Sequence, residues 1–335
     1  MPITPQQAAE FEAVLARTRK AVVTTHMNPD GDAFGSALAM SFFLDRRGID
    51  HEVVHHDGHT PFTLKFLPGV ERIHQTWRDS EEPDVAIVLD LNNLDRIGMP
   101  QSEFIATVPT MVLIDHHVPH QSPGDLRLVD TSSPATCLIL FELFKHIGAK
   151  ITPEMATCLL TGIVTDTGSF RYGNTTTAAV EAAAELSELG ADIVKISQES
   201  YMKKELASTL LLGTGLHKMH LEENGQLAWT VLDSPDFEGA GASEEHAEGL
   251  TNELLSINTV QIAAVIRQPP GRKLRASIRS REQYDVSAVA RLFNGGGHKN
   301  AAGCTFTSSI QEAERDLIVE LKKCLASSTS TSRKA

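Results

Sequence analysis

A loop near the start of the chain contains one imidazole, His26, and two carboxylates, Asp30 and Asp32. A short apolar run precedes the loop and predicts a strand, while Pro29 and Gly31, on either side of Asp30, predict a turn. A turn allows the three side chains to point to a common centre, as the ligands of a hard divalent metal do. For this loop taken alone, the alternative is an aspartate that caps a helix beside a solvent-facing histidine.

Acidic and imidazole side chains recur at or near the ends of three apolar runs further along the chain. They are Asp90 after the run 85–89, Asp115-His116-His117 after the run 111–114, and Asp166 within the segment 162–168. A lone carboxylate is seldom left at the end of a buried run, because removing its charge from water is costly. A shared divalent cation would supply the missing partner.

Six of these side chains are candidate metal ligands. They are His26, Asp30, Asp32, Asp90, His116 and Asp166. Six ligands are too many for one catalytic ion with open positions, and they suit two ions that share one bridging carboxylate. Such a pair can activate a water near neutral pH and stabilise the attacking and leaving oxygens of an in-line displacement at phosphorus. The pattern therefore predicts a two-metal hydrolase of phosphate esters.

The order of these motifs resembles the DHH phosphoesterase superfamily with its DHH-associated C-terminal domain. The motifs are His26-x-x-x-Asp30-x-Asp32, Asp90, Asp115-His116-His117, Asp166 and Gly295-Gly296-Gly297-His298. Each motif is weak evidence by itself, but five in this order are specific. The chain length and the near absence of extra domains are similar to the nano-RNase and pAp phosphatase group, whose members are bifunctional oligoribonucleases. The resemblance covers about residues 20–310.

The resemblance also implies roles for the residues of the first half. Its first metal would be held by His26, Asp30 and Asp90, and its second by Asp32, Asp90, His116 and Asp166. Asp90 would bridge the two ions, Asp115 would orient His116, and His117 would face the scissile phosphate. Manganese is the metal that the family implies, with magnesium or cobalt as alternatives.

The resemblance assigns substrate binding mainly to the second half of the chain. The residues that would bind substrate there are Arg279, Ser280, Gly295, Gly296, Gly297 and His298. Successive glycines can aim backbone N–H groups at an anion, and arginine suits a phosphate. Asn294 stands where the family more often has a glycine, and asparagine tolerates positive φ. Arg171 is a further candidate for a phosphate contact, with a surface arginine as the alternative.

Hydrophobic periodicity predicts an α/β fold with two domains. Residues 1–190 are expected to form a larger domain with a mostly parallel sheet flanked by helices, and 222–326 a smaller mixed α/β domain. A helical connector is expected at 191–221 and a disordered tail at 327–335. A helix is expected to start near Gly35, after the first loop. Polar residues at the ends of parallel strands place the site at the carboxyl edge of the first sheet.

Composition restricts the partners of this chain. The 335 residues include 30 basic and 43 acidic side chains, and the net charge of −13 argues against non-specific binding to long nucleic acid. A short anionic substrate held by metals and a few arginines remains compatible with that charge. No long apolar run, secretory signal or paired cysteine spacing is present in the sequence, so no membrane association and a cytoplasmic location are expected.

These observations favour a metal-dependent phosphoesterase that converts short oligoribonucleotides to nucleoside monophosphates, pAp to AMP, or both. Three alternatives remain open: a cyclic-dinucleotide phosphodiesterase, an inorganic pyrophosphatase, and a non-catalytic nucleotide- or RNA-binding module. The pyrophosphatase would carry a different C-terminal domain, and the binding module would be expected to lack a ligand. The family also suggests a homodimer. His55, His56 and His59 are expected at a strand end and an exposed loop rather than at a metal.

Overall fold

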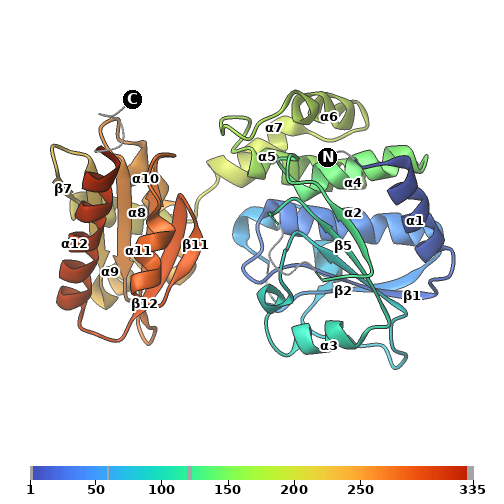
Figure 1. The fold of residues 1–335 in the computed structure, drawn as a ribbon, viewed down its shortest axis with the longest axis horizontal. Helices are drawn as coiled ribbons and strands as arrows, with labels where there is room; N and C mark the ends of the chain where they lie inside the picture. The colour runs from blue at the N-terminus through green and yellow to red at the C-terminus, as the bar shows by residue number, and fades with distance from the viewer. Residues whose placement is uncertain (1–2, 59, 119–122, 330–335) are drawn as a thin grey trace. The chain divides into compact units, whose positions relative to one another are not determined.

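The computed structural model describes residues 3–58, 60–118 and 123–329. The chain divides into two compact units between Lys203 and Lys204, and each unit contains a six-stranded sheet (Figure 1). The predicted α/β class is confirmed. The segment 191–221, expected to be a connector, is shared between the units, because its first part packs against the first unit and its last part against the second.

The sheet of the first unit is parallel throughout, as the apolar strand pattern predicted. Its strands are β1 Lys20–Thr24, β2 Asp50–Val54, β3 Ile73–His74, β4 Val85–Leu89, β5 Thr110–Asp115 and β6 Leu126–Val129. The spatial order is β3-β2-β1-β4-β5-β6, so the winding direction changes between β1 and β4. Open parallel sheets bind ligands beyond the carboxyl ends of the strands at such a switch point.

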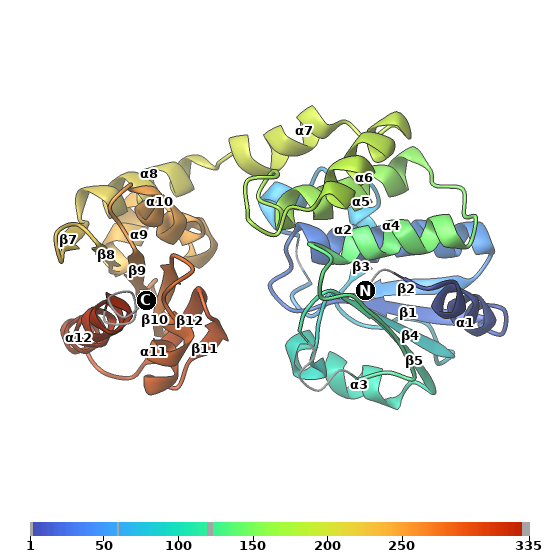
Figure 2. The same cartoon turned by 45° about the horizontal axis from the view of Figure 1, so that its top comes forward.

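Helices cover both faces of this sheet. They are α1 Pro5–Leu15, α2 Gly31–Arg47, α3 Gln101–Thr107, α4 Thr136–His146, α5 Pro153–Asp166, α6 Thr177–Glu188 and α7 Ile193–Ser197. Short helical turns lie at Phe62–Leu64, Val70–Arg72, Leu94–Ile97 and Gln198–Met202. Helices α1, α2, α4 and α5 lie on one face and α3 on the other (Figures 1 and 2). Because both faces are buried, β4 is a continuous apolar run, and β1 is apolar at its three central residues.

Helix α2 begins at Gly31 rather than near Gly35. The reason is a local cap, because the side chain of Asp30 accepts hydrogen bonds from the backbone N–H groups of Asp32 and Ala33. The N-terminal end of α2 also lies very close to α5. A Cβ atom on Gly31 would lie 2.4 Å from Thr165 Oγ1, so glycine is required for this approach. The cap and the close contact together place Asp32 against the last turn of α5.

The second unit contains a mixed sheet of order β11-β12-β10-β9-β8-β7. Its strands are β7 His220–Glu222, β8 Leu227–Leu232, β9 Ile262–Arg267, β10 Leu274–Ser280, β11 Gly296–His298 and β12 Ala301–Phe306. Its helices are α8 Leu206–His217, α9 Ser234–Ala240, α10 Leu250–Ser256, α11 Val286–Leu292 and α12 Ile310–Thr329, with a short turn at Glu244–Ala247. Helices α8, α9 and α10 pack on one face, and α11 and α12 pack on the other (Figure 2).

Two local expectations for the second half differ from the structure. The glycine loop forms a short strand, β11, because Gly296–His298 pair with β12 at the edge of the sheet. Helix α12 continues to Thr329, so 327–329 are helical rather than disordered, and 330–335 lie outside the described residues.

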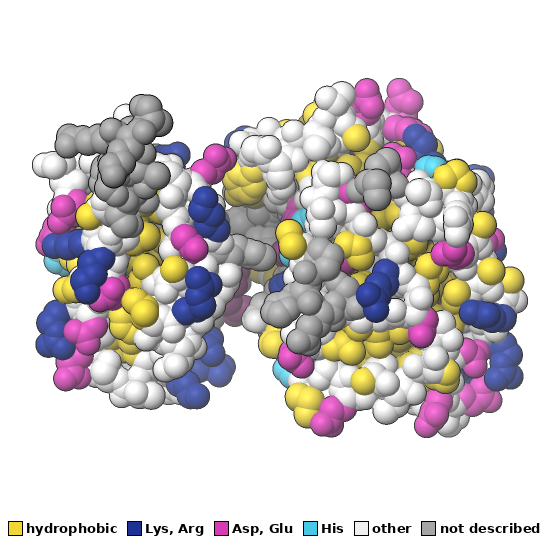
Figure 3. Space-filling view, in the orientation of Figure 1, with side chains coloured by type: hydrophobic (Ala, Val, Ile, Leu, Met, Phe, Trp, Pro, Cys, Tyr) yellow, Lys and Arg dark blue, Asp and Glu magenta, His cyan; other side chains and the backbone are white. Residues whose placement is uncertain are grey.

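The surface of each unit carries charges of both signs. Basic and acidic side chains are intermixed on the visible face of each unit (Figure 3). Among the described residues, no helix combines the length and the apolar character needed to cross a bilayer.

Candidate metal centre

The predicted ligands come together at the carboxyl edge of the first sheet. His26 follows β1, Asp90 follows β4, and His116 and His117 follow β5. The remaining carboxylates are supplied by two helix ends, with Asp30 and Asp32 at the start of α2 and Asp166 as the last residue of α5. The cluster therefore lies at the topological switch point of this sheet.

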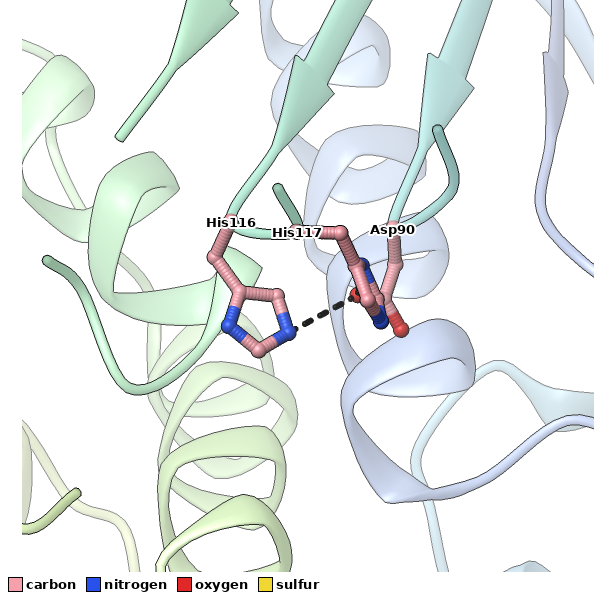
Figure 4. A group of neighbouring side chains, drawn as sticks. All are labelled: Asp90, His116 and His117. Atoms are coloured by element: carbon pink, nitrogen blue, oxygen red, sulfur yellow. Dashed lines mark ion pairs between the residues drawn. The ribbon is translucent and has the colours of Figure 1, made fainter. Parts of the chain in front are cut away.

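Asp90 occupies the middle of the cluster. Only 1% of its surface is exposed. Its Oδ2 lies 3.4 Å from His26 Nε2, and its Oδ1 lies 3.4 Å from His116 Nε2. Figure 4 shows the His116 ring at the end of β5 pointing to the Asp90 carboxylate at the end of β4. The backbone φ of Asp90 is +60°, a conformation that costs a non-glycine residue free energy and is often found at functional sites.

Potential ligand atoms gather in three overlapping groups around Asp90. Within each group the donor atoms lie within 4.8 Å of one another, and the groups are His26/Asp30/Asp90, Asp32/His116/Asp166 and Asp90/His116/His117. The first two groups divide the six predicted ligands into two sets on either side of the Asp90 carboxylate. This arrangement is compatible with two cations that share one carboxylate.

Both imidazoles of the predicted ligand set present the same nitrogen to the carboxylates. His26 Nδ1 lies 2.9 Å from the carbonyl oxygen of Met27, and His116 Nδ1 lies 3.3 Å from that of Ser133. A proton on Nδ1 is thereby satisfied, and Nε2 is left to bind a metal. Fixing the tautomer through a backbone carbonyl is characteristic of metal-binding histidines. The donor set of carboxylates and oriented imidazoles therefore fits a divalent cation such as manganese.

The start of α4 holds two of the carboxylates in place. Asp32 is fully buried, and its two oxygens accept hydrogen bonds from the N–H groups of Thr136 (2.6 Å) and Cys137 (2.9 Å). The Thr136 hydroxyl donates to Asp90 Oδ1 over 3.1 Å. Sequence reasoning missed Thr136. The available signal was a helix whose N-cap residue, Ala135, has no polar side chain, so that another residue must bind the first N–H groups.

Burial and crowding change the protonation of the ligands. Burial, followed by the charge of Asp90, raises the pKa of Asp32 to about 7. Burial and the charges of Asp32 and Asp30 raise the pKa of Asp166 well above its usual value. Burial alone would lower the pKa of His116, but its hydrogen bond to Asp90 and the neighbouring carboxylates raise it to about 10.

Asp90 behaves in the opposite way. Burial would raise the pKa of Asp90, but the hydrogen bonds from His116 and His26 outweigh burial and lower it. The cluster thus keeps one carboxylate ionised at its centre and favours protons on Asp32, Asp166 and His116. Cation binding would replace those protons, because metal ligands must be deprotonated.

Asp115 contacts a different histidine from the one expected. Its Oδ1 lies 2.7 Å from His117 Nδ1 and accepts a hydrogen bond from the His117 backbone N–H. The chain turns sharply after β5, so the carboxylate meets the residue two positions ahead, whereas His116 is oriented by Ser133. Asp115 Oδ2 is buried and finds no hydrogen-bond partner among the described residues.

Arg171 lies in a strained turn that follows Asp166. Ser169 and Phe170 have φ values of +59° and +62°, which few non-glycine residues adopt. The guanidinium of Arg171 lies 5.5 Å from the centre of the Tyr201 ring, and its Nε donates to the carbonyl oxygen of Gly168 over 2.6 Å. Arg171 thus follows the predicted ligand Asp166 closely in the sequence, and its contacts with Tyr201 and Gly168 give its side chain a defined position.

His55 lies at a strand end, as expected, because it directly follows β2. Its side chain is buried, and its Nε2 lies 2.9 Å from the carbonyl oxygen of His26. Its ring also meets Phe34 edge to face, with 4.9 Å between the ring centres. His55 therefore supports the backbone of the first loop. His56 is half-buried and contacts Gln101, and His59 lies outside the described residues.

The predicted substrate-binding residues of the second unit lie near one end of its sheet. Arg279 pairs in register with Ala301, which in turn pairs with His298. Asn294 has a φ of +55°, as expected for a residue that replaces glycine. The hydroxyl of Ser280 is 3.0 Å from both Tyr284 O, to which it donates, and Asn300 Nδ2, from which it accepts.

The glycines on either side of Gly296 are required by close packing against β12. A Cβ atom on Gly295 would lie 2.2 Å from the carbonyl oxygen of Gly303, and one on Gly297 would lie 2.4 Å from that of Ala301. Gly297 also has a φ of +139°. Close strand pairing therefore explains both glycines, and their predicted role in binding substrate stays a prediction.

Comparisons with known proteins match each unit separately and the chain as a whole. The model of the DHH family N-terminal domain matches residues 20–163, and that of the DHHA1 domain matches residues 224–327. The bifunctional oligoribonuclease and PAP phosphatase NrnA of Thermus thermophilus is 31% identical over 284 residues, which is 84% of this chain and 83% of that protein. Its counterpart in Bacillus subtilis is 29% identical over 300 residues, covering 88% of this chain and 92% of that protein.

A solved structure extends the likeness to the fold. The crystal structure of an exopolyphosphatase-related protein from Bacteroides fragilis superposes with a TM-score of 0.90 at 29% sequence identity. The match covers 96% of this chain and 97% of that chain.

Proposed function

The chain belongs to the DHH family, and on this basis we propose that it hydrolyses short oligoribonucleotides to nucleoside monophosphates and pAp to AMP. Phosphoester hydrolysis is the chemistry of the family, and the substrates are those named for the Thermus and Bacillus relatives. The observation that carries the proposal is the convergence of six candidate ligands, Asp90 at their centre, from five segments of the chain.

Two divalent cations, manganese by preference, would be held on either side of Asp90. One would take His26 and Asp30, and the other His116 together with the buried Asp32 and the partly buried Asp166. When bound, the pair would lower the pKa of a water and stabilise negative charge on the phosphate oxygens. The support for this assignment is the division of the donor atoms into two groups and the common orientation of the two imidazoles, whose Nε2 atoms both face Asp90.

His117 would act on the substrate rather than on a metal. Asp115 fixes its ring through Nδ1, and the proposed role of Nε2 is to face the leaving oxygen or the scissile phosphate. A histidine oriented by a buried carboxylate can donate a proton to a leaving group. Hydrolysis of a ribonucleotide ester needs this step, because the departing ribose oxygen is a poor leaving group until it is protonated.

Substrate phosphates beyond the reacting one would be bound by arginine and backbone N–H groups. Arg171 in the first unit, and Arg279 with the strand Gly296–His298 in the second, are the proposed contacts. Bidentate arginine suits a phosphate, and glycine lets the backbone approach an anion closely. The hydroxyl of Ser280 already has two partners, so we assign Ser280 the support of this region instead of direct contact.

The alternatives can be ranked by the same observations. The DHHA1 match counts against an inorganic pyrophosphatase, which would carry a different C-terminal domain. A non-catalytic module is disfavoured because all six ligands are present and converge. A cyclic-dinucleotide phosphodiesterase would use the same two domains and is therefore included in the test.

The test is a product assay on purified protein with manganese. A linear diribonucleotide, pAp, a cyclic dinucleotide and pyrophosphate are offered side by side, with the Asp90→Ala protein as control. Nucleoside monophosphates from the first and AMP from the second, both absent in the control, support the proposal. Phosphate from pyrophosphate alone would replace it with an inorganic pyrophosphatase, and metal binding without turnover would replace it with a binding module.

A further inference from the structure

A short hairpin of the second unit is strongly basic in an acidic protein. The fifteen residues 267–281 contain six arginines and lysines and no acidic residue, although the whole chain has a net charge of −13. This segment comprises the end of β9, the turn and β10. Only Arg279 and Ser280 of the segment have been given a role in substrate binding above. The remaining positive charge needs its own explanation.

Three polar side chains of β10 form a row on one face of the sheet. Burial alternates along the strand, with Leu274, Ala276, Ile278 and Ser280 buried and the residues between them wholly or partly exposed. The residues between them are Arg275, Ser277 and Arg279. Residues two positions apart on a strand are separated by about 6.8 Å. This separation is close to that of successive phosphates in an extended nucleotide chain.

Arg267 on the neighbouring strand β9 adds positive charge beside Arg275, at one end of the row. It pairs in register with Arg275, so two arginines lie side by side on adjacent strands. Its Nη1 donates to the hydroxyl of Ser277 over 2.6 Å. Its Nε is buried and has no hydrogen-bond partner among the described residues. Like charges directly opposite each other destabilise a sheet, so the pair calls for a compensating anion.

Glu244 supplies part of that compensation. Its Oε1 lies 2.9 Å from Arg275 Nη1 and 3.7 Å from Arg267 Nη2. About half of the Arg275 side chain is exposed, and an exposed ion pair of this kind contributes little free energy. A phosphate of a bound substrate can therefore compete with Glu244 for the arginines.

We propose that Arg275, with Arg267 and Ser277, forms a second phosphate subsite two steps, or about 13.6 Å, beyond Arg279 along β10. This inference rests on the proposed function and deepens it. A substrate whose phosphate contacts Arg279 extends along the row, and an additional phosphate reaches Arg275. The subsite therefore favours oligoribonucleotides of about four residues over dinucleotides and pAp, which have no phosphate to place there. Glu244 limits the gain by occupying the arginines when no phosphate is bound.

The test compares kcat/KM for di-, tri- and tetraribonucleotides and for pAp. Arg275→Gln should lower kcat/KM for the tetranucleotide about tenfold, the loss expected for one charge-assisted phosphate contact, and at least five times more than for the dinucleotide. Glu244→Gln should raise kcat/KM for the tetranucleotide relative to that for the dinucleotide, because it removes the carboxylate that competes with the substrate phosphate. Arg315→Gln, an exposed arginine of α12 on the opposite face, is the matched control and should leave the ratio unchanged. Equal losses for all lengths, or none, would overturn the subsite.

A binding measurement separates this inference from the proposed function. In an Asp90→Ala background, the dissociation constants of the di- and tetranucleotide are measured with and without Arg275→Gln. A weaker tetranucleotide complex with an unchanged dinucleotide complex supports the subsite even if the wild-type protein cleaves neither, in which case the proposed function fails. An unchanged tetranucleotide complex would overturn the subsite whatever the activity.

Discussion

The metal centre of the first unit and the basic hairpin of the second use opposite means to handle charge. At the metal centre, Asp32 and Asp90 are almost completely buried, and backbone N–H groups, a threonine hydroxyl and oriented imidazoles fix their positions. On the hairpin, Arg275 is half exposed and pairs with a glutamate at the surface. Reacting groups need a fixed geometry, whereas the recognition of substrate length needs contacts that can be exchanged. The comparison predicts that changes at the centre affect every substrate equally.

The largest effect is expected from Asp90→Asn. The amide keeps the shape of the side chain but removes the charge shared by both predicted cation positions, so activity should fall at least about a thousandfold on dinucleotide, tetranucleotide and pAp alike. Initial rates at saturating manganese test this, with circular dichroism to show that the fold is retained. A loss restricted to one substrate would break the comparison.

Thr136→Val should have the next largest effect. It removes the hydroxyl bonded to Asp90 but leaves the backbone N–H bonded to Asp32, so manganese affinity should fall about ten- to a hundredfold. Titration of activity against manganese concentration measures the shift. Thr157→Val is the matched control, because the Thr157 hydroxyl is exposed and bonds only to the preceding turn of its own helix. An equal shift in Thr157→Val would show that the Thr136 hydroxyl has no specific role in manganese binding.

The protonation of the centre predicts how the stability of the metal-free protein depends on pH. The pKa of Asp32 is raised to about 7 and that of His116 to about 10, so each favours the folded state below its ordinary pKa and loses that contribution as pH rises through the folded value. Tm of the metal-free protein should therefore fall by several degrees between about pH 5 and pH 8, and manganese should restore it most at the higher pH. A Tm that rises over this range without metal would contradict the description of the centre.

Arg171→Gln should have the smallest effect of the set. Its guanidinium is held by Tyr201 and Gly168 in the turn that follows Asp166, and one lost phosphate contact should raise KM about fivefold with little change in kcat. The loss should be the same for all substrate lengths, in contrast to Arg275→Gln. A length-dependent loss would show that Arg171 recognises substrate length, as proposed for the hairpin, and would contradict the distinction between the two regions.

The sequence predicted the parallel sheet because its strands leave local signals, and similar signals single out the six candidate ligands. Strands such as 85–89 are unbroken apolar runs, and a charged residue directly after such a run is conspicuous. The positions of helix ends were predicted less well. Helix α2 starts at Gly31 because Asp30 caps it, which the spacing of apolar residues does not reveal.

Contacts between distant segments could not be predicted from the sequence. The bonds from Thr136 to Asp32 and Asp90 join residues 104 and 46 positions apart. The exchange of partners at Asp115, which orients His117 rather than His116, depends on the direction of the chain after β5. The row of Arg275, Ser277 and Arg279 could have been found from the alternation of the strand, but only the pairing with β9 places Arg267 beside it.

The central claim is that Asp90 bridges two cations, and manganese stoichiometry tests it most directly. Equilibrium dialysis followed by metal analysis should give two manganese ions per chain, and electron paramagnetic resonance should show that they are magnetically coupled. Asp166→Asn should weaken one site, while Asp90→Asn should weaken both and abolish the coupling. A single manganese per chain, or two coupled ions in Asp90→Asn, would contradict the account.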